Sequence, residues 1–253
     1  MTVSILGCGW FGTVLSKALR DQGHAVKGST TSGDKLDSNR SHLIKLTSAE
    51  DSVYDPVFFD CDIIVIANNV RMNDEVAYLQ RINFTIELIK RFNIPKVIFI
   101  SSTSVYGEPG TTVDETTAPQ AGTLSAKLLV QAEQLFQTAS FNWTVLRFAG
   151  LIGPGRDPGR FFAGKSSIPN GLAPVNLLHI DDAVGITLQL IATASDHQII
   201  NAVSPDHPSR MDFYRTAAKH SGLELPDFIA TCVQWKIVNS CYTDYKYTHN
   251  LLS

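Results

Sequence analysis

Cysteine is sparse in this sequence, and long hydrophobic runs are absent. The four cysteines, Cys8, Cys61, Cys232 and Cys241, lie far apart without a Cys-x-x-Cys pair, which excludes a zinc ribbon and a dense disulfide framework. No apolar run approaches the roughly 18 residues that a membrane-spanning helix needs, and residues 1–6 lack the basic start of a signal peptide. We therefore expect a cytoplasmic protein with reduced thiols and no membrane partner.

The sequence also lacks a strong excess of one sign of charge. The 21 Lys and Arg residues are spread along the chain against 24 Asp and Glu, so no basic block is present that would neutralise nucleic-acid phosphates. The seven histidines show no His-x-x-x-His spacing, which gives a metal site no support. Neither nucleic acid nor a metal ion is therefore an expected partner.

Two kinds of segment alternate over the first 150 residues. Short runs rich in Val, Ile and Phe predict buried strands at 3–6, 25–28, 43–46, 62–67, 96–100 and 144–148. Apolar residues at helical spacing predict helices at 11–21, 74–92 and 123–138 between them. Strand and helix in alternation predict an α/β fold of the Rossmann type, a doubly wound parallel sheet with helices on both faces.

The pattern changes after residue 150. Residues 150–174 hold six Gly and four Pro, which predicts an irregular loop, and regular structure resumes as a helix at 182–193, a strand at 198–203 and a helix at 210–221. Asp182, directly before an apolar periodic run, is predicted to be a helix N-cap. We expect a dinucleotide-binding domain at 1–152, to which 174–203 return, and a smaller C-terminal substrate lobe made of 153–173 and 204–253.

A glycine-rich loop follows the first predicted strand. Residues 7–12 read GCGWFG, a G-x-G-x-x-G between strand and helix, which is the context that a dinucleotide-binding loop requires. The first Gly permits the turn, the second admits a pyrophosphate to the backbone, and the third lets helix and strand pack closely. The candidate cofactor contacts in this loop are Gly7, Gly9, Trp10, Phe11 and Gly12.

The end of the second strand bears on the choice of cofactor. An acid at that place binds the ribose 2′-hydroxyl of NAD, but no acid occurs here before Asp34. Lys27 and Lys35 lie near four hydroxyl residues that suit a 2′-phosphate: Ser29, Thr30, Thr31 and Ser32. The charge pattern favours NADP, and NAD stays open as the alternative because no Arg occupies the obvious place.

A second glycine pattern does not predict a nucleotide site. Residues 159–166 read GRFFAGKS and match the phosphate loop G-x-x-x-x-G-K-[ST], but Pro169 and Gly171 prevent the helix that must follow it. Arg156, Arg160 and Lys165 instead predict either a flap that meets an anionic substrate or a solvated basic loop.

The strand at 96–100 and its continuation identify a family. Residues 97–107 read VIFISSTSVYG, followed by Pro119, Lys127 and Glu133, then LRF at 146–148, GPG at 153–155 and HIDDA at 179–183. This pattern resembles the short-chain dehydrogenase/reductase superfamily, in its extended or atypical NAD-dependent epimerase/dehydratase branch. The resemblance covers nearly the whole chain and is specific to the superfamily, not to a substrate.

The resemblance implies a catalytic set with one departure. The superfamily uses a Ser or Thr, a Tyr as acid and base, and a Lys four residues after the Tyr; Ser102 and Lys127 match the first and last. Thr123 stands where the Tyr would be, and an ordinary hydroxyl is a far weaker acid than a phenol. Tyr106 is the nearest Tyr that could replace it.

Further cofactor contacts are expected on three elements. Asn68 and Asn69 follow the strand at 62–67, and strand ends are the ligand edge of an open parallel sheet. The resemblance implies that Asn83 lies near the cofactor phosphates, that Phe148 passes the nicotinamide, and that the helices at 74–92 and 123–138 pair in a homodimer.

The sequence therefore leaves two hypotheses for the function. The first is an NADP-dependent oxidoreductase of the atypical short-chain dehydrogenase/reductase type, acting on a small polar substrate, which is anionic if the basic segment forms the flap. The second is a non-catalytic NADP-binding sensor or regulatory protein, which the loss of the Tyr favours. Fold alone does not decide between them.

Overall fold

The computed structural model describes residues 1–253 except 49, 69, 71–74, 194–196 and 252–253. The chain forms two compact units. Unit 1 comprises 1–102, 123–147 and 187–199, and unit 2 comprises 103–122, 148–186 and 200–253. No helix of the described residues is long and apolar enough to cross a membrane.

The main sheet has seven strands in the order β10-β7-β5-β4-β1-β2-β3. Their bounds are β1 (Thr2–Leu6), β2 (Ala25–Thr30), β3 (His42–Leu43), β4 (Ile63–Ile66), β5 (Lys96–Ser102), β7 (Asn142–Phe148) and β10 (Gln198–Ala202). Strand β1 pairs in parallel with both β2 and β4, and β4 with β5. This order reverses at β1, as in a doubly wound sheet, and confirms the predicted Rossmann fold.

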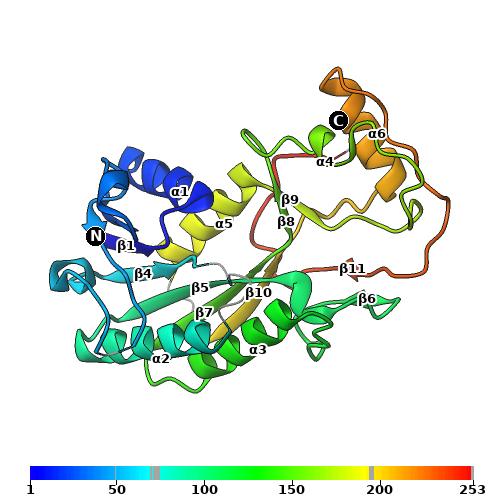
Figure 1. The fold of residues 1–253 in the computed structure, drawn as a ribbon. Coiled ribbons are helices and arrows are strands. Elements are labelled where there is room, and N and C mark those ends of the chain that lie inside the picture. The colour runs from blue at the N-terminus through cyan, green and yellow to red at the C-terminus, as the bar shows by residue number, and fades with distance from the viewer. Residues whose placement is uncertain (49, 69, 71–74, 194–196, 252–253) are drawn as a thin grey trace. The chain divides into compact units, whose positions relative to one another are not determined.

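Three helices of unit 1 cover the two faces of this sheet. Helix α1 (Trp10–Asp21) lies on one face, and α2 (Glu75–Arg91) and α3 (Leu124–Gln137) lie side by side on the other (Figure 1). All four residues of β4 are buried, because a strand covered by helices on both faces has no solvent side. The stripe Phe11, Leu15 and Leu19 buries α1 against the sheet.

The expected strand at 43–46 is wrong in its extent. Strand β3 contains only His42 and Leu43, which pair with the end of β2. The ladder stops there because Lys45 exchanges both backbone hydrogen bonds, of 2.7 and 2.9 Å, with Val53. Ile44 and Leu46 are nevertheless buried. The apolar pattern therefore indicated buried side chains correctly, but it did not indicate the length of the strand.

Unit 2 is built from shorter elements. They are β6 (Thr112–Val113), β8 (Gly150–Ile152), α4 (Gly159–Phe162), β9 (Leu177–His179), α5 (Ile180–Ala192, whose last turns belong to unit 1), α6 (Arg210–His220) and β11 (Ile237–Val238). Two parallel ladders, β8 with β9 and β6 with β11, organise it around a small core that includes Ile152, Phe213 and Leu251. The loop expected at 150–174 therefore contains one short strand and one helical turn.

The units differ from the expected division of the chain. Residues 103–122 and 174–186 were expected in the nucleotide-binding domain and group with unit 2. Two hydrogen bonds explain why residues 103–122 group with unit 2. Lys236 donates from Nζ to the carbonyl of Gly107 at 2.6 Å, and Glu115 accepts from the backbone N–H of Asn201 at 2.7 Å.

The predicted N-cap role of Asp182 is wrong. Helix α5 begins at Ile180, so Asp182 lies in its first turn, with a buried side chain. Its carboxylate accepts from Tyr245 Oη at 3.0 Å and from the backbone N–H and hydroxyl of Thr248 at 2.9 and 2.7 Å. Burial opposes ionisation, yet the donors of Thr248, Tyr245 and His249 outweigh it and hold the pKa of Asp182 below its ordinary value. This carboxylate anchors the C-terminal segment to α5.

Candidate functional site

The loop between β1 and α1 makes the tight turn that its first glycine predicts. Gly7 has φ +95°, a region that favours glycine, and a Cβ on it would lie 2.3 Å from Oδ1 of Asn68. The backbone N–H of Gly9 donates to the carbonyl of Gly7 at 2.8 Å, which closes the turn. No other residue type fits position 7 without moving the end of β4.

The second and third glycines have different surroundings. A Cβ on Gly12 would lie 2.9 Å from the carbonyl oxygen of Gly7 and 3.2 Å from Ile5, so Gly12 is needed for α1 to pack on β1. A Cβ on Gly9 would meet nothing within 4 Å. Protein packing therefore does not require a glycine at position 9, whereas close approach of a phosphate to its backbone does.

Helix α1 directs its positive end at this loop. Gly9 is its N-cap and makes no side-chain capping hydrogen bond, and no acidic residue lies in the first turn. A helix start of this kind offers backbone N–H groups and partial positive charge to an anion. The loop thus fits the diphosphate of a dinucleotide.

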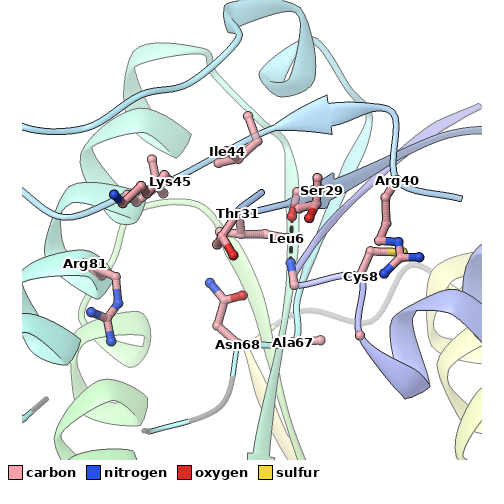
Figure 2. A pocket seen from close by; sticks show the side chains of 14 residues that line it. Leu6, Cys8, Ser29, Thr31, Arg40, Ile44, Lys45, Ala67, Asn68 and Arg81 are labelled. Carbon is pink, nitrogen blue, oxygen red and sulfur yellow. Dashed lines mark hydrogen bonds between the residues drawn. The ribbon is translucent and has the colours of Figure 1, made fainter. Parts of the chain in front are cut away.

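A cavity of about 380 Å³ lies over this loop, at the carboxyl ends of β1, β2 and β4 (Figure 2). Ser29 forms part of its wall and accepts a hydrogen bond of 2.8 Å from the backbone N–H of Gly7 to its hydroxyl. The lining residues are Leu6, Gly7, Cys8, Gly9, Ser29, Thr30, Thr31, Arg40, Ile44, Lys45, Leu46, Ala67, Asn68 and Arg81.

The cavity is basic. Arg40 lies beside Cys8, and Arg81 and Lys45 line the opposite side (Figure 2). None of the lining residues is acidic. Arg40 pairs with Asp37, which lies outside the lining, and both side chains are partly exposed. An anion in this cavity meets cations and hydroxyls, and no carboxylate belongs to the lining.

The hydroxyl residues at the end of β2 and directly after it divide into two groups. Ser29, Thr30 and Thr31 line the cavity, as does Asn68, two residues after β4. Ser32 does not, because its hydroxyl is hydrogen-bonded to Asp34.

Other expected cofactor contacts lie outside this lining. Phe11 is buried on the inner side of α1, Trp10 is half-buried at the start of the same helix, and Asn83 is exposed on α2. Phe148 is buried at the end of β7. Asn69 lies outside the described residues.

Three cations were missed by sequence reasoning: Arg40, Lys45 and Arg81. None belongs to a motif, because each reaches the cavity from a separate segment. One signal was present for Arg40, since a glycine inside a strand marks a close backbone approach. A Cβ on Gly28 in β2 would overlap the carbonyl oxygen of Asn39 at 1.6 Å, so this glycine lets residues 39–40 cross β2.

The three expected catalytic residues lie on two elements of unit 1 that pack together. Ser102 is the half-buried last residue of β5, and Lys127 is exposed in the first turn of α3. Thr123 is the N-cap of α3 and accepts the backbone N–H of Ala126 at 3.2 Å on its hydroxyl. The hydroxyl that replaces the expected phenol therefore stabilises the helix that carries Lys127.

Tyr106 is engaged elsewhere. Its side chain is 1% exposed, and its hydroxyl donates to Oδ1 of Asn201 at 3.0 Å. A phenol buried on an amide is poorly placed to protonate a substrate.

A buried ion pair lies next to these elements. Arg147 of β7 donates to both carboxylate oxygens of Glu133 on α3, at 2.6 Å for Nη2 to Oε2, and Ser101 of β5 donates to Oε1 at 2.5 Å. Both charged side chains are 2% exposed. The network joins α3 to β5 and β7 and sets the place of the helix that carries Lys127.

The basic segment of unit 2 does not form a phosphate loop. Helix α4 begins at Gly159, the first residue of the matching pattern. The segment between β8 and α4 contains no strand that could lead directly into this helix. Arg160 is 80% exposed with Asp157 at 3.7 Å, and Nζ of Lys165 lies 5.7 Å from the ring centre of Phe162. These surroundings agree with the prediction that residues 159–166 do not form a phosphate loop.

Comparison with known proteins assigns the family. A family model described as NAD(P)H-binding matches residues 7–170. The chain belongs to this NAD(P)H-binding family. Protein YeeZ of Escherichia coli (strain K12) is 40% identical over 237 residues, which cover 89% of this chain and 86% of YeeZ.

Solved structures agree on the fold of this NAD(P)H-binding protein. UDP-glucuronic acid 4-epimerase from Bacillus cereus, in complex with NAD, matches with a TM-score of 0.80 and 18% identity, covering 100% of this chain and 95% of that one. A protein from Methylobacillus flagellatus assigned to the NAD-dependent epimerase/dehydratases matches with a TM-score of 0.75 and 25% identity, covering 94% and 88%. The predicted resemblance to the epimerase/dehydratase-like branch of the superfamily is confirmed.

Proposed function

We propose that this NAD(P)-binding protein prefers NADP(H) and acts as an oxidoreductase on a small polar substrate. The observation that carries the proposal is the cavity over the glycine loop, whose lining has three cations and no acid. NAD selection in this fold uses a carboxylate at the end of the second strand, and that place here holds Ser29, Thr30 and Thr31.

Each part of the cavity has one task in this proposal. The loop backbone around Gly9 holds the diphosphate, and Arg40 with the hydroxyls of Ser29 and Thr31 holds the ribose 2′-phosphate. A guanidinium suits this task because it stays charged and offers several donors in one plane. The ion pair of Arg40 with Asp37 orients the guanidinium and is partly exposed, so Arg40 can turn toward a stronger anion.

The chemical step rests on Ser102 and Lys127. When bound, NADPH would supply a hydride to an electrophilic carbon of the substrate. Ser102 would donate a hydrogen bond to the substrate oxygen, and the ammonium of Lys127 would stabilise the negative charge that develops there. The proton that this oxygen gains comes from a group other than Thr123, whose hydroxyl caps α3 and is a weak acid.

The second candidate is an NADP(H)-binding sensor without turnover. The commitment of the Thr123 hydroxyl to its helix and of the Tyr106 phenol to Asn201 favours it. Both candidates share the same cofactor site and differ only in whether a substrate is reduced.

Calorimetric titration with NADPH, NADP and NADH at one pH and salt concentration tests the shared part. We expect micromolar NADPH binding and NADH binding at least about tenfold weaker, which is about 1.4 kcal/mol. Equal affinities overturn the NADP preference, and the absence of binding by all three overturns both candidates.

A substrate screen then separates the two candidates. Carbonyl compounds with and without an anionic group are supplied with NADPH, and loss of the reduced-nicotinamide absorbance is followed. Turnover that falls in Lys127→Met but not in the exposed control Lys90→Met supports the oxidoreductase. NADPH binding without turnover of any compound favours the sensor.

A further inference from the structure

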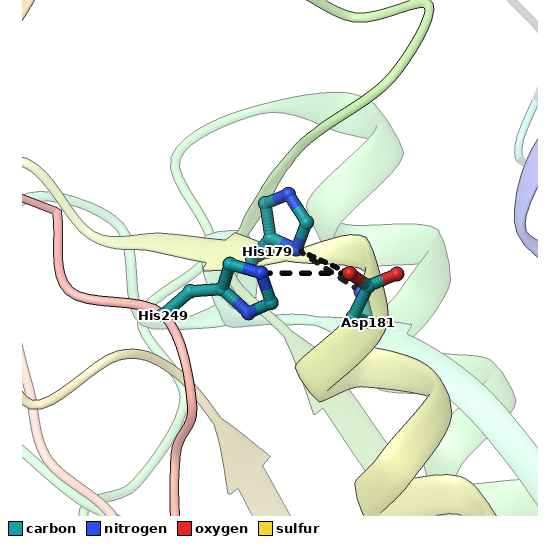
Figure 3. Close-up of side chains that lie close together, drawn as sticks. All are labelled: His179, Asp181 and His249. Carbon is teal, nitrogen blue, oxygen red and sulfur yellow. Dashed lines mark hydrogen bonds and ion pairs between the residues drawn. The ribbon is translucent and has the colours of Figure 1, made fainter.

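A polar cluster in unit 2 is held together by its own contacts. His249 of the C-terminal segment lies against His179 at the end of β9 and Asp181 in the first turn of α5 (Figure 3). The two imidazole rings stack at 3.7 Å between centroids, and Nδ1 of His179 accepts the backbone N–H of Asp181 at 3.3 Å. The lone pairs of two stacked rings do not converge on one ion, so this cluster does not fit a metal. It joins the C-terminal segment to the start of α5.

The cavity over the glycine loop, in contrast, has a second cationic side. Lys45 and Arg81 lie opposite Cys8 and Arg40 (Figure 2). The proposed function uses the loop backbone for the diphosphate and Arg40 for the ribose 2′-phosphate. Lys45 and Arg81 therefore face a third part of the ligand.

Both of these cations are placed by the fold of unit 1. The backbone of Lys45 exchanges hydrogen bonds of 2.7 and 2.9 Å with Val53, although Lys45 itself is exposed. Arg81 lies on α2, and its guanidinium carbon is 5.9 Å from the ring centre of Tyr78, which is 1% exposed. One side chain thus extends from a fixed backbone and the other lies on a core aromatic ring.

The third part of the ligand is the purine base. The sugar that carries the 2′-phosphate also carries the base, so a dinucleotide held at Gly9 and Arg40 places its base in the same cavity. Apolar side chains suit the flat faces of a base, and a guanidinium stacks well on such a ring. The apolar aliphatic lining residues are Leu6, Ile44, Leu46 and Ala67.

The edge of the base decides which purine fits. Adenine presents an amino donor at C6 beside the acceptor N7, whereas a 6-oxo purine presents two acceptors, O6 and N7. Lysine and arginine side chains only donate hydrogen bonds, and they commonly pair with O6 and N7 together. None of the described lining residues has a carboxylate that could accept from the amino group of adenine.

The amide of Asn68 adds to this donor character. Its Oδ1 lies toward the glycine loop, where a Cβ on Gly7 would collide with it. Its amide nitrogen is directed to the side of the cavity that holds Arg81 (Figure 2). The base therefore meets donors from three side chains at this end of the cavity.

We propose that Lys45 and Arg81 bind the C6–N7 edge of the purine, so that the cavity accepts a dinucleotide with a 6-oxo purine at least as well as one with adenine. The inference rests on the proposed function, because that function places the dinucleotide on the loop at Gly9. It adds a selectivity for the base, set on the opposite side of the cavity from Arg40.

Calorimetric titration with two matched pairs of cofactors tests the base site. The pairs are NADPH with its hypoxanthine analogue and NADH with its hypoxanthine analogue, in which oxygen replaces the amino group at C6. We expect each analogue that binds to do so at least as tightly as its adenine partner. Tighter binding of the adenine form in the pairs that bind would overturn the proposal.

Single variants decide whether the two cations read the base. Lys45→Met and Arg81→Met should each weaken binding of the hypoxanthine analogue of NADPH by about tenfold, because a donor to O6 and N7 is lost, and weaken NADPH binding less. Lys90→Met, an exposed cation on the same helix as Arg81 but outside the lining, should leave both affinities unchanged. Because Lys45 is exposed, Lys45→Met keeps the test valid if Arg81→Met fails to fold. An analogue-to-NADPH affinity ratio that stays constant in the folded cavity variants contradicts the assignment.

Failure of this inference is distinguishable from failure of the proposed function. Equal affinities for NADPH and NADH overturn the NADP preference, yet the comparison within each pair still reports on the base. Binding that favours adenine in each pair overturns the base site alone. The absence of binding by all four compounds overturns the cofactor site and this inference with it.

Discussion

The backbone N–H of Gly7 donates a hydrogen bond of 2.8 Å to the hydroxyl oxygen of Ser29. This bond joins the end of β1 to the end of β2, the two places where the sequence predicted phosphate contacts. The Ser29 hydroxyl accepts from the loop and keeps its own proton to donate to a ligand. One small side chain thus serves both the shape of the loop and the proposed 2′-phosphate site.

Ser29→Ala should weaken NADPH binding by about fivefold to tenfold, because one hydrogen bond of roughly 1 kcal/mol is lost from the site and the Gly7 N–H loses its partner. The measurement is a calorimetric titration, with Ser38→Ala as an exposed serine outside the cavity lining. Equal losses in both variants would remove Ser29 from the site.

Gly9→Ala and Gly12→Ala should separate ligand binding from folding. A Cβ at position 9 meets no protein atom, so Gly9→Ala should keep its melting temperature and lose at least about tenfold in NADPH affinity, or about 1.4 kcal/mol. Gly12→Ala should instead lower the free energy of unfolding by about 1–3 kcal/mol, because its Cβ crowds the Gly7 carbonyl. Unchanged NADPH affinity in Gly9→Ala would contradict the proposed path of the diphosphate.

Arg40→Gln should reduce the preference for NADPH over NADH. A hydrogen bond to a charged group contributes about 1.5–3 kcal/mol, so NADPH affinity should fall at least about tenfold while NADH affinity stays constant. Lys35→Gln is the matched control, since Lys35 also follows β2 but does not line the cavity. An equal loss for both cofactors would show that Arg40 contacts a part that they share.

Glu133→Ala should cost about 3–5 kcal/mol of unfolding free energy, because it leaves the buried guanidinium of Arg147 without its partner. The double variant Glu133→Leu with Arg147→Met should recover most of this loss, since apolar groups of similar size replace a desolvated pair. Urea unfolding followed by circular dichroism measures both, with Glu87→Ala on the exposed side of α2 as control. A single variant within about 1 kcal/mol of wild type would mean that the pair contributes little, as exposed pairs do.

Cys8 should react slowly with iodoacetamide at neutral pH. Burial, only partly offset by Thr13 and nearby arginines, raises the pKa of the Cys8 thiol, so its reactive thiolate becomes abundant only at higher pH than for an ordinary thiol. Its alkylation rate should therefore keep rising to a higher pH than that of an ordinary thiol, for which a short cysteine peptide is the reference. Peptide mass spectrometry across a pH series measures both rates.

Bound NADPH should slow the reaction of Cys8 further, because Cys8 lines the cavity, and should leave Cys232 unaffected. Labelling of Cys8 as fast as that of Cys232 at neutral pH would show that the loop opens to solvent.

Local pattern was sufficient for most of the fold. Helix α3 begins after Thr123 and ends before Thr138, where apolar spacing placed it, and the glycine loop joins β1 to α1 as predicted. These features depend on residues within one or two turns of each other. Strand β3 and Asp182 were mistaken because each is decided by a distant segment, Val53 in the first case and residues 245–249 in the second.

The sequence by itself determined the Rossmann sheet, the phosphate loop and the family, because strand burial, helix periodicity and glycine spacing are local properties of the chain. Only the tertiary structure brought Arg40, Lys45 and Arg81 around one cavity and His179 beside His249. Those groups come from segments whose separation along the chain carries no pattern. Their meeting depends on backbone crossings, such as that of residues 39–40 over Gly28, which arise once the sheet and its connections are packed.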